Sequence, residues 1–515
     1  MKLKNILYAL SLVTLSACGD FLEPKSQSEY VPKNANSLQE MLVGSAYPQH
    51  KTGHNFLAYL EIFNDDLQQQ VLDDYAFGSN NQVTGEALGN MFSWQSDMFT
   101  VMTQLGYTAP NVWKAAYEYI LGANAALDYI GDVSGSEDEK NYIIAQALGL
   151  RAFYYYILVN YYGAPYNYNK AALGVPLKLD SGMREESEIL MTRNTVEEVY
   201  TQIVKDLNEA ERLFLTLPVD KQYQPNYMVS LPMVELLKSR IYLYMENWTE
   251  AKKYAGKVIN DWNFSLLNLN TIALPDPTVN EPYYEFTSYQ SPEVIWLYGN
   301  IQEFAAQYNT YLTSTTSTSL ATRKAFTASE SLLSSFKDGD LRKELYIVRE
   351  ILVNSKNANL NTFYDTYLPY GKYKTNNSSP TTGGDYFALS FRLSEAYLNF
   401  AEAAALDDAE GEAISAMNTL LEKRYTPETY TTISGLTGEA LVNMIRAERR
   451  KELCYEGQRW FDLRRYGMPS FTHTWNNVTY TLTENDRSYT MPLSQQIMDK
   501  NKKLEQNPLA PRRTN

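Results

Sequence analysis

Hydrophobic residues recur at helical spacing in three long stretches of the chain. In residues 111–130 the apolar and small side chains stand three and four positions apart, which predicts a helix with one buried face. They are Val112, Ala115, Ala116, Tyr119, Ala123, Ala126, Leu127 and Ile130. Residues 141–162 form a longer apolar, tyrosine-rich helix, ended by a Gly-Ala-Pro segment. Residues 195–217 open with Thr-Val-Glu-Glu, a typical helix cap. The pattern therefore predicts a mostly helical protein.

Two further pairs of predicted helices resemble each other. Both pairs have the residue spacing of a tetratricopeptide repeat, in which small side chains let two antiparallel helices approach closely. The first pair carries Ser239, Tyr242, Ala251, Ala255 and Val258, and the second carries Ala401, Ala404, Ala413, Met417 and Leu420. Lys238 departs from the pattern, because it stands where the repeat prefers Leu. Two unrelated helical hairpins remain an alternative explanation.

The region between these two pairs has a different pattern. Prolines and Ser/Thr-rich runs predict loops there. Residues 293–298 read as one short strand, and aromatic alternation in residues 361–374 predicts another. Loops carried on a rigid scaffold are common sites of function. The sequence therefore predicts a helical scaffold interrupted by a loop-rich insertion.

The first residues have the pattern of a targeting signal. Lys2 and Lys4 precede a short apolar run, which ends in Leu-Ser-Ala-Cys at Cys18. The run is shorter than the ~20 residues that span a bilayer, so it indicates a signal peptide. The last four residues resemble the lipobox of bacterial lipoproteins, which implies cleavage before Cys18 and a lipid on its sulfur. Residues 1–17 are thus expected to be a signal peptide and residues 18–36 a tether; ordinary secretion with an incidental cysteine is the alternative.

Charge and metal-binding residue types exclude several function classes. The formal net charge is −15, whereas nucleic-acid binding needs a basic surface. Of the three histidines, His50 and His54 stand four apart, but in a proline- and glycine-containing loop, so no metal site is expected. Cys18 and Cys454 are the only cysteines, and they do not make a disulfide framework. No cofactor is predicted.

Tyrosine is unusually frequent, with 42 residues against 7 Trp and 19 Phe. A protein that binds neutral sugars needs exposed aromatic rings beside polar side chains. Trp94 lies in a Gly/Asn/Ser/Gln-rich stretch and is expected to be solvent-accessible and to stack on a sugar ring. The other candidates are loop tyrosines: Tyr283, Tyr284, Tyr308 and Tyr311. Each ring could instead pack against the helical layer.

Near the C-terminal end, Glu448, Glu452 and Glu456 recur every four residues beside Arg449 and Arg459. Carboxylates on one helix face could act as a general acid and base if their environments differed. The same charges could instead form ion pairs that fix the last helices together. The second interpretation is favoured, so no catalytic residue is expected.

The stretch from Ile445 to Gly467 carries a family resemblance. Its sequence, Ile-Arg-Ala-Glu-Arg-Arg-Lys-Glu-Leu-Cys-Tyr-Glu-Gly-Gln-Arg-Trp-Phe-Asp-Leu-Arg-Arg-Tyr-Gly, resembles the C-terminal signature of SusD/RagB proteins. Four other segments also resemble the family: residues 18–24, 147–166, 389–405 and the closing Met-Pro-Leu and Glu-Gln-Asn-Pro motifs. The resemblance is weakest over residues 271–382.

This resemblance implies a mostly α fold, with a tetratricopeptide-like scaffold of four helix pairs, a loop-rich insertion and few short strands. Residues 37–270 would be the N-terminal SusD-like helical part and residues 271–515 the C-terminal RagB/SusD part of one integrated unit. It implies a lipid-anchored protein on the outer membrane, facing the cell surface. Such proteins capture oligosaccharides for a SusC-like TonB-dependent transporter, and a minority capture peptides, which is the alternative function.

Non-family alternatives are less well supported. A barrel-type glycoside hydrolase would alternate strands and helices, and this chain does not. A helical-repeat adaptor for other proteins gains nothing from a lipobox. We therefore expect a glycan-binding lipoprotein that is not an enzyme, bound to the membrane only by its lipid, with no nucleic-acid partner.

Overall fold

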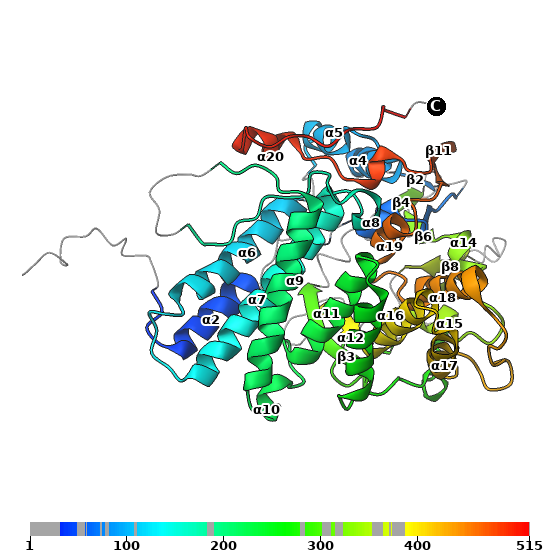
Figure 1. Ribbon diagram of the computed structural model, residues 1–515. Coiled ribbons are helices and arrows are strands. Elements are labelled where there is room, and N and C mark those ends of the chain that lie inside the picture. Colours follow the sequence, from blue (N-terminus) through cyan, green and yellow to red (C-terminus); the bar gives the residue numbers. More distant parts are fainter. Residues whose placement is uncertain are drawn as a thin grey trace, which may run out of the picture.

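The computed structural model describes residues 31–48, 57, 59–72, 75–77, 82–107, 111–182, 190–278, 284–300, 311–314, 323–352, 364–369, 372 and 387–513. The protein is mostly helical, as predicted (Figure 1). The three helices expected from apolar periodicity are α6 (Val112–Tyr129), α7 (Glu137–Tyr162) and α9 (Val196–Thr216). Their predicted positions agree with the structure to within a few residues.

The local sequence explains where these helices begin and end. The Thr195 side chain accepts a hydrogen bond from the backbone of Glu198, and the Glu198 carboxylate accepts one from the Thr195 backbone at 2.8 Å. The same capping box, made by Ser136 and Glu139, starts α7 earlier than the apolar pattern predicted. The α7 helix ends at Gly163, whose N–H donates to the Val159 carbonyl.

The scaffold helices pack in chain order. α2 (Ala35–Ala46) packs on α6 and α7, α7 packs on α9, and α9 packs on α11 (Leu231–Tyr244). Next, α11 packs on α12 (Trp248–Asn260), α12 on α16 (Leu393–Leu406), and α16 on α17 (Glu410–Leu421) and α18 (Gly438–Glu452). Figure 1 shows this row of helices. The two predicted repeat-like pairs, α11–α12 and α16–α17, are therefore neighbours in one stack.

Packing between α11 and α12 explains the polar residue in the repeat pattern. Ala251 and Ala255 are fully buried, and the Ser239 hydroxyl donates to the Ala251 carbonyl at 3.0 Å. Lys238 is also buried, and its ammonium pairs with Glu211 of α9 and donates to the Tyr254 hydroxyl at 2.6 Å. An ion pair with a third helix thus replaces the apolar contact that Leu would make.

The α7 helix forms the centre of the N-terminal half. It is the one helix, among the described residues, that is long and apolar enough to cross a membrane. Most of its apolar window lies inside the protein, so its hydrophobicity is explained by core packing. Arg151 in this helix is buried and makes a bidentate ion pair with Asp206 of α9, with N–O distances of 2.7 and 2.8 Å.

The described strands are short and antiparallel, and several of them gather with short helices toward one end of the helical row (Figure 1). The strands predicted over residues 293–298 and 361–374 correspond to β3 and β8. The pairs are β3 (Val294–Asn300) with β9 (Phe387–Arg392), β7 (Val348–Leu352) with β8 (Tyr364–Leu368), β10 (Phe471–Trp475) with β11 (Val478–Leu482), and β1 (Leu67–Gln69) with β6 (Phe326–Ala328). A three-stranded sheet has the order β2 (Tyr75–Ala76), β4 (Tyr311–Ser314) and β5 (Arg323–Lys324).

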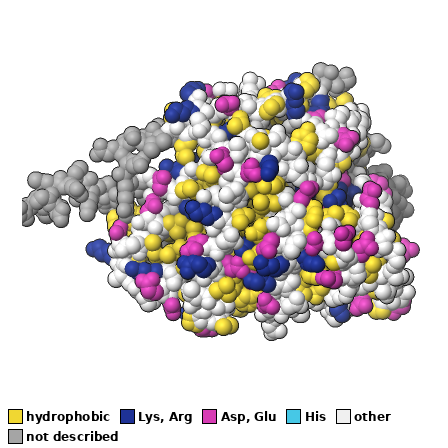
Figure 2. All heavy atoms as spheres, viewed as in Figure 1, with side chains coloured by type: hydrophobic (Ala, Val, Ile, Leu, Met, Phe, Trp, Pro, Cys, Tyr) yellow, Lys and Arg dark blue, Asp and Glu magenta, His cyan; other side chains and the backbone are white. Residues whose placement is uncertain are grey.

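Short helices complete the fold around the scaffold. They are α3 (Leu60–Phe63), α4 (Gln82–Phe92), α5 (Met98–Gln104), α8 (Tyr166–Asn169), α10 (Val219–Gln222), α14 (Glu330–Leu333), α15 (Arg342–Tyr346), α19 (Arg459–Arg465) and α20 (Gln495–Lys500). Two 3₁₀ turns lie at η2 (Leu269–Thr271) and η4 (Arg487–Tyr489). Figure 2 shows the helical face, where acidic and basic side chains are interspersed.

Candidate ligand-binding clefts

Two adjoining clefts lie among the short strands, away from the helical stack. The first cleft, of about 910 Å³, lies between α4, the segment after β1 and the turn of the β10–β11 hairpin. The second cleft, of about 1020 Å³, lies between the same segment, β8 and β10. Residues 69–72 line both clefts. Both volumes are at the upper end of the range typical of ligand sites, ~300–1,000 Å³.

The first cleft combines aromatic rings with side-chain amides. Phe77 and Tyr480 line it and are each partly exposed. The amide side chains that line it are Gln69, Gln70, Gln82, Asn90, Gln95, Asn476 and Asn477. Aromatic faces stack on the C–H groups of sugars, and amides donate to and accept from hydroxyls. The cleft therefore has the chemistry that a neutral, hydroxyl-rich ligand needs.

Glycines in α4 let two rings of the first cleft lie directly against this helix. A Cβ on Gly85 would stand 2.6 Å from Cγ of Phe77, and a Cβ on Gly89 would collide with the Trp475 indole. The Trp475 ring is buried and lies 5.5 Å from the Phe77 ring, centroid to centroid. Because Gly85 and Gly89 have no side chains, the Phe77 and Trp475 rings can pack directly on α4 at the side of the first cleft.

The second cleft has its own rings and is lined mainly by hydroxyls. Tyr367 and Phe471 are its partly exposed aromatic residues. Its hydroxyl side chains are Thr327, Ser329, Ser331, Thr366, Ser470, Thr472 and Thr474. Thr472 and Thr474 are exposed because β10 alternates between buried and exposed positions. Each cleft therefore offers rings and polar groups of its own.

The arginines that line the first cleft already have acidic partners. Arg513 pairs with Asp486 at 2.7 Å, and Arg512 pairs with Asp97. Glu86 is also exposed there. An anionic ligand would therefore have to displace an existing ion pair.

Two of the three acids that line the second cleft, Asp65 and Asp365, are paired in the same way, and the third, Glu330, is exposed. Asp65 accepts two hydrogen bonds from Arg459, at 2.7 and 2.9 Å, and Asp365 pairs with Arg349 at 2.7 Å. Burial opposes ionisation of Asp65, but the Arg459 and Arg450 guanidinium groups hold its pKa well below the usual range. The lining is thus largely neutralised internally.

Trp94 is buried, so the expectation that it is solvent-accessible is wrong. Its side chain is 0% exposed, and its Nε1–H donates to the Phe63 carbonyl at 2.9 Å. Its ring stacks on His473 at 4.2 Å and meets Phe471 edge-on at 5.2 Å. These partners come from the β10–β11 hairpin, far along the chain. Local sequence therefore could not reveal that Trp94 packs beneath the clefts.

His473 links the buried rings to the wall of the second cleft. Its ring stacks on Phe92 and Trp94, and its two nitrogens lie 2.7 Å from the Phe92 carbonyl and 2.8 Å from the Asn64 carbonyl. Burial lowers its pKa to about 4, although the two carbonyl contacts act in the opposite direction. The imidazole ring thus packs the hairpin against α4 and the segment before β1.

Tyr284 is the one predicted tyrosine whose side chain the structure describes, and it does not lie with Trp94. Tyr284 is partly buried and packs edge-on against Phe286 at 4.9 Å; neither cleft is lined by it. Tyr311 lies in β4 next to Leu312, which lines the first cleft. Tyr283 and Tyr308 lie outside the described residues, as do Cys18, His50 and His54.

The hairpin residues that line the clefts were missed by the sequence analysis, although a signal was present. Residues 471–482 alternate apolar and threonine positions around Asn476 and Asn477, a typical hairpin pattern. Both asparagines have positive φ, 49° and 65°, as a tight two-residue turn requires. The run of three glutamines at 68–70 was also overlooked.

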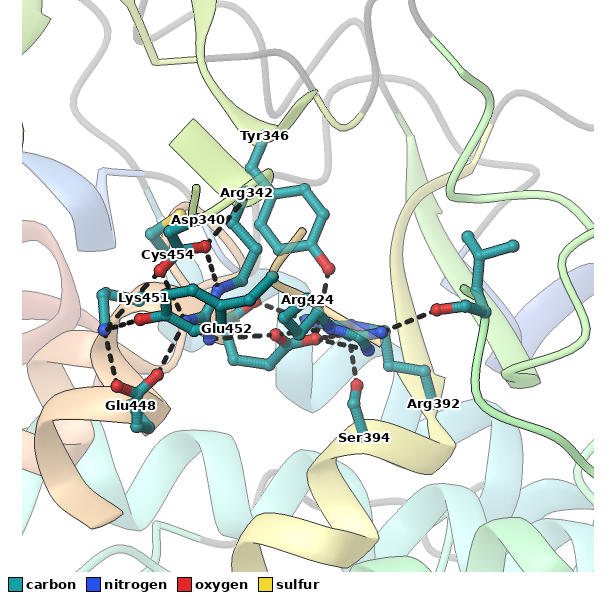
Figure 3. Close-up of polar contacts among 12 residues, drawn as sticks. Asp340, Arg342, Tyr346, Arg392, Ser394, Arg424, Glu448, Lys451, Glu452 and Cys454 are labelled. Carbon is teal, nitrogen blue, oxygen red and sulfur yellow. Dashed lines mark hydrogen bonds and ion pairs between the residues drawn. The ribbon is translucent and has the colours of Figure 1, made fainter. Parts of the chain in front are cut away.

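The acidic residues of the C-terminal signature form a buried ion-pair network, which confirms the structural interpretation (Figure 3). Glu452 is fully buried and accepts from Arg392 at 2.5 Å and from Arg424 at 2.9 Å. Tyr346 also donates to it at 3.2 Å. Burial opposes ionisation, but these guanidinium groups hold the pKa of Glu452 well below its usual range.

The other two carboxylates have similar partners. Glu448 pairs with Arg342 and Lys451, and Glu456 pairs with Lys372 at 2.6 Å. The expected geometry was wrong in one respect, because α18 ends at Glu452 and Glu456 lies beyond it.

The expected neighbours also have other partners. Arg449 pairs with Asp462 at 2.8 Å, and Arg459 pairs with Asp65. The network therefore joins loops and strands from distant parts of the chain, not only the last helices.

Within the described part of the chain, the residue types that commonly bind metals do not form a metal site. No group of three or more His, Cys, Asp or Glu residues there is placed to hold an ion. Cys454 is buried, and burial raises the pKa of its thiol to about 12. It packs in the turn after α18.

A helical stack with polar, ring-lined clefts at its strand-rich end defines a binding protein built on a helical-repeat scaffold. Comparison with protein families is consistent with this. A family described as "Starch-binding associating with outer membrane" matches residues 20–243, and the SusD family matches residues 350–509. Together the two matches cover most of the sequence. The chain belongs to the SusD/RagB family.

Individual relatives agree in length and fold. SusD-like protein P25 of Formosa agariphila is 22% identical, over 91% of this chain and 90% of its own length. A SusD superfamily protein from Bacteroides thetaiotaomicron has a TM-score of 0.67 at 21% identity and covers 92% of this chain and 100% of that one. A structure described as a putative sugar binding protein, from Bacteroides vulgatus, has a TM-score of 0.67 at 24% identity and covers 93% and 99%. These structures share its fold.

Proposed function

We propose that this protein is a cell-surface lipoprotein that captures neutral oligosaccharides and delivers them to a SusC-like TonB-dependent transporter of the outer membrane. The observation that carries the proposal is the pair of clefts, where partly exposed rings stand among amides and hydroxyls. Family membership supports a carbohydrate-binding role in nutrient uptake in general.

The charge pattern of the clefts favours a neutral ligand. Both arginines of the first cleft pair with acids, and Glu86 and Glu330 are exposed at the two sites. Sulfated glycans, uronate-rich glycans and acidic peptides would be repelled by these two acids. Among the described lining residues, no Lys or Arg without an acidic partner would compensate for that repulsion. Neutral sugars can use the amides and hydroxyls without displacing an ion pair.

The proposal includes no catalysis. Proteins of the SusD family are binding proteins, and the carboxylates of the signature are buried and ion-paired. A glycosidase needs two carboxyl groups that reach the scissile bond from opposite sides. Glu448, Glu452 and Glu456 instead contact arginines, lysines and a tyrosine inside the protein.

The ligand residues that we propose are Phe77 and Tyr480 in the first cleft and Tyr367 and Phe471 in the second. Tyr311 remains a candidate from the sequence, in a strand that contributes Leu312 to the first cleft. The loop tyrosines Tyr283, Tyr284 and Tyr308 remain candidates from the sequence.

A glycan array tests the proposal. The probe is the soluble protein produced without its first 18 residues, which removes the proposed lipid site at Cys18. We expect binding to one neutral glycan class and no release of reducing sugar on incubation with that glycan. Binding to neutral peptides with no binding to any glycan would instead support the peptide-capture alternative.

A further inference from the structure

We infer that the two clefts are halves of one extended site, which holds a neutral oligosaccharide chain across the segment of residues 69–72. The inference rests on the proposed function and adds that ligand length is recognised. The segment lines both clefts, so it is the wall that the two clefts share. Because it lies between them, it acts as a saddle, and that name is used for residues 69–72 below.

Hydrogen bonds fix the saddle on both sides. The Gln69 side chain donates to Oδ1 of Asn476 at 2.9 Å and accepts from the Asn476 backbone at 2.6 Å. On the other side, the Gln70 amide donates to the Thr366 hydroxyl at 2.9 Å. One bond reaches the hairpin turn of the first cleft and the other reaches β8 in the second. The saddle is therefore a defined surface joined to both clefts.

An apolar contact surface lies on the saddle itself. Val71 is 62% exposed, and it is among the most exposed large hydrophobic residues described. This exposed valine side chain could make an apolar contact with the C–H face of a sugar ring that crosses from one cleft to the other. The neighbouring amides of Gln69 and Gln70 are within the same segment and offer partners for its hydroxyls.

Binding groups repeat on the two sides of the saddle. The β10–β11 hairpin lines both clefts: its first strand contributes Phe471, Thr472 and Thr474 to the second, and its turn and second strand contribute Asn476 and Tyr480 to the first. Each side thus has partly exposed rings and neutral polar groups. A set of binding groups that recurs in two clefts matches a polymer of similar units better than one compact ligand.

Calorimetry with oligosaccharides of increasing length tests the inference. The probes are α-1,4-glucan, β-1,4-glucan and β-1,4-mannan series, each from disaccharide to octasaccharide. For the series that binds, we expect affinity to rise at least tenfold between the shortest and longest members. One long chain should bind per protein, because it occupies both clefts.

Two blocking variants separate the clefts. Gln82→Arg adds a long, charged side chain at an exposed position of the first cleft, and Thr472→Arg does so in the second. Each should reduce the affinity for the octasaccharide to about that for a short oligosaccharide. Val219→Arg, at a position of α10 that is 76% exposed outside both clefts, is the matched control. Thr474→Arg replaces Thr472→Arg if circular dichroism reveals misfolding.

The outcomes distinguish this inference from the proposed function. Length-independent affinity, two long chains per protein, or full affinity in a folded second-cleft variant would overturn the extended site while leaving glycan capture intact. Failure of all three series to bind would count against glycan capture and against the extended site together.

Discussion

At the residue scale, the network around Glu452 replaces the hydrophobic contacts expected at the centre of a protein. Arg342, Arg392 and Arg424 converge on this one carboxylate from three parts of the chain (Figure 3). Buried ion pairs of this kind are costly to break, since removal of one partner leaves an uncompensated charge. The signature charges therefore determine which loops and strands meet.

We predict that Glu452→Gln lowers stability by ~3–5 kcal/mol, because the amide cannot neutralise the surrounding guanidinium groups. Glu209→Gln, in an exposed pair with Arg212, is the matched control and should leave the melting temperature nearly unchanged. Thermal denaturation of both variants measures the difference. Equal melting temperatures would mean that the network does not stabilise the fold.

A second buried carboxylate gives a pH-dependent prediction. Burial opposes ionisation of Glu402, but bidentate contact with Arg465 lowers its pKa from 4.5 to about 2. A lowered folded-state pKa contributes stability that is present above pH 4.5 and lost as the pH falls toward 2. Glu402→Gln should therefore be less stable at neutral pH, and its deficit should narrow over that window. A constant deficit in melting temperature would contradict this assignment.

Trp94 illustrates what local sequence can and cannot predict. Its immediate neighbours are polar, which suggested an exposed ring. Its actual partners, Phe63, Phe471 and His473, come from α3 and the C-terminal hairpin. Whether a side chain is buried depends on contacts between segments that are far apart in the chain. A single sequence does not show which distant segments meet. By contrast, the sequence predicted that the signature acids form ion pairs, because charged residue types recur there at regular spacing. It did not predict their partners, since Arg342, Arg392 and Arg424 come from distant segments.

At the element scale, the helices were the most predictable part of the fold. The caps at Ser136 and Thr195 and the apolar periodicity are local, so they can be read directly. The ladder between β3 and β9 joins distant residues, and only its first strand was predicted. Short elements such as α4 and β1 depend on tertiary packing, which explains why the clefts they line were not predicted.

The α4 helix gives a prediction about close packing. A Cβ on Gly89 would overlap the buried Trp475 ring, so Gly89→Ala should destabilise the protein by ~1–3 kcal/mol through overpacking. Gly44→Ala in α2 is the control, because nothing lies within 4 Å of the added Cβ. Alanine should stabilise that exposed helical position by ~0.5–1 kcal/mol. Equal effects of the two substitutions in chemical denaturation would refute the close contact.

At the scale of the whole molecule, the proposed lipid anchor would hold the protein at the cell surface. The sequence ending in Leu-Ser-Ala-Cys predicts a lipid on Cys18. We predict that Cys18→Ala releases the protein from membranes or blocks its processing. Cell fractionation measures this, with Cys454→Ala as the control because that cysteine is buried. A Cys18→Ala protein that is processed and membrane-bound as before would contradict lipid anchoring.

The overall architecture follows from the resemblance in the C-terminal signature, which pointed to a helical-repeat scaffold with a looped face. The position of the proposed binding surface did not follow from it. The candidate tyrosines were chosen for loop context, whereas the clefts are lined by residues from α4, β8 and the β10–β11 hairpin. Those elements meet only after folding.

The most direct test of glycan capture is calorimetric titration of Phe77→Ala and Tyr480→Ala with the glycan selected on the array. Loss of one stacking ring should weaken binding by ~1–3 kcal/mol, by analogy with base stacking on aromatics, or roughly tenfold or more in Kd. Tyr168→Ala, which removes an exposed ring outside both clefts, should bind as the wild type does. Wild-type affinity in folded Phe77→Ala and Tyr480→Ala proteins would contradict the assignment of the binding site.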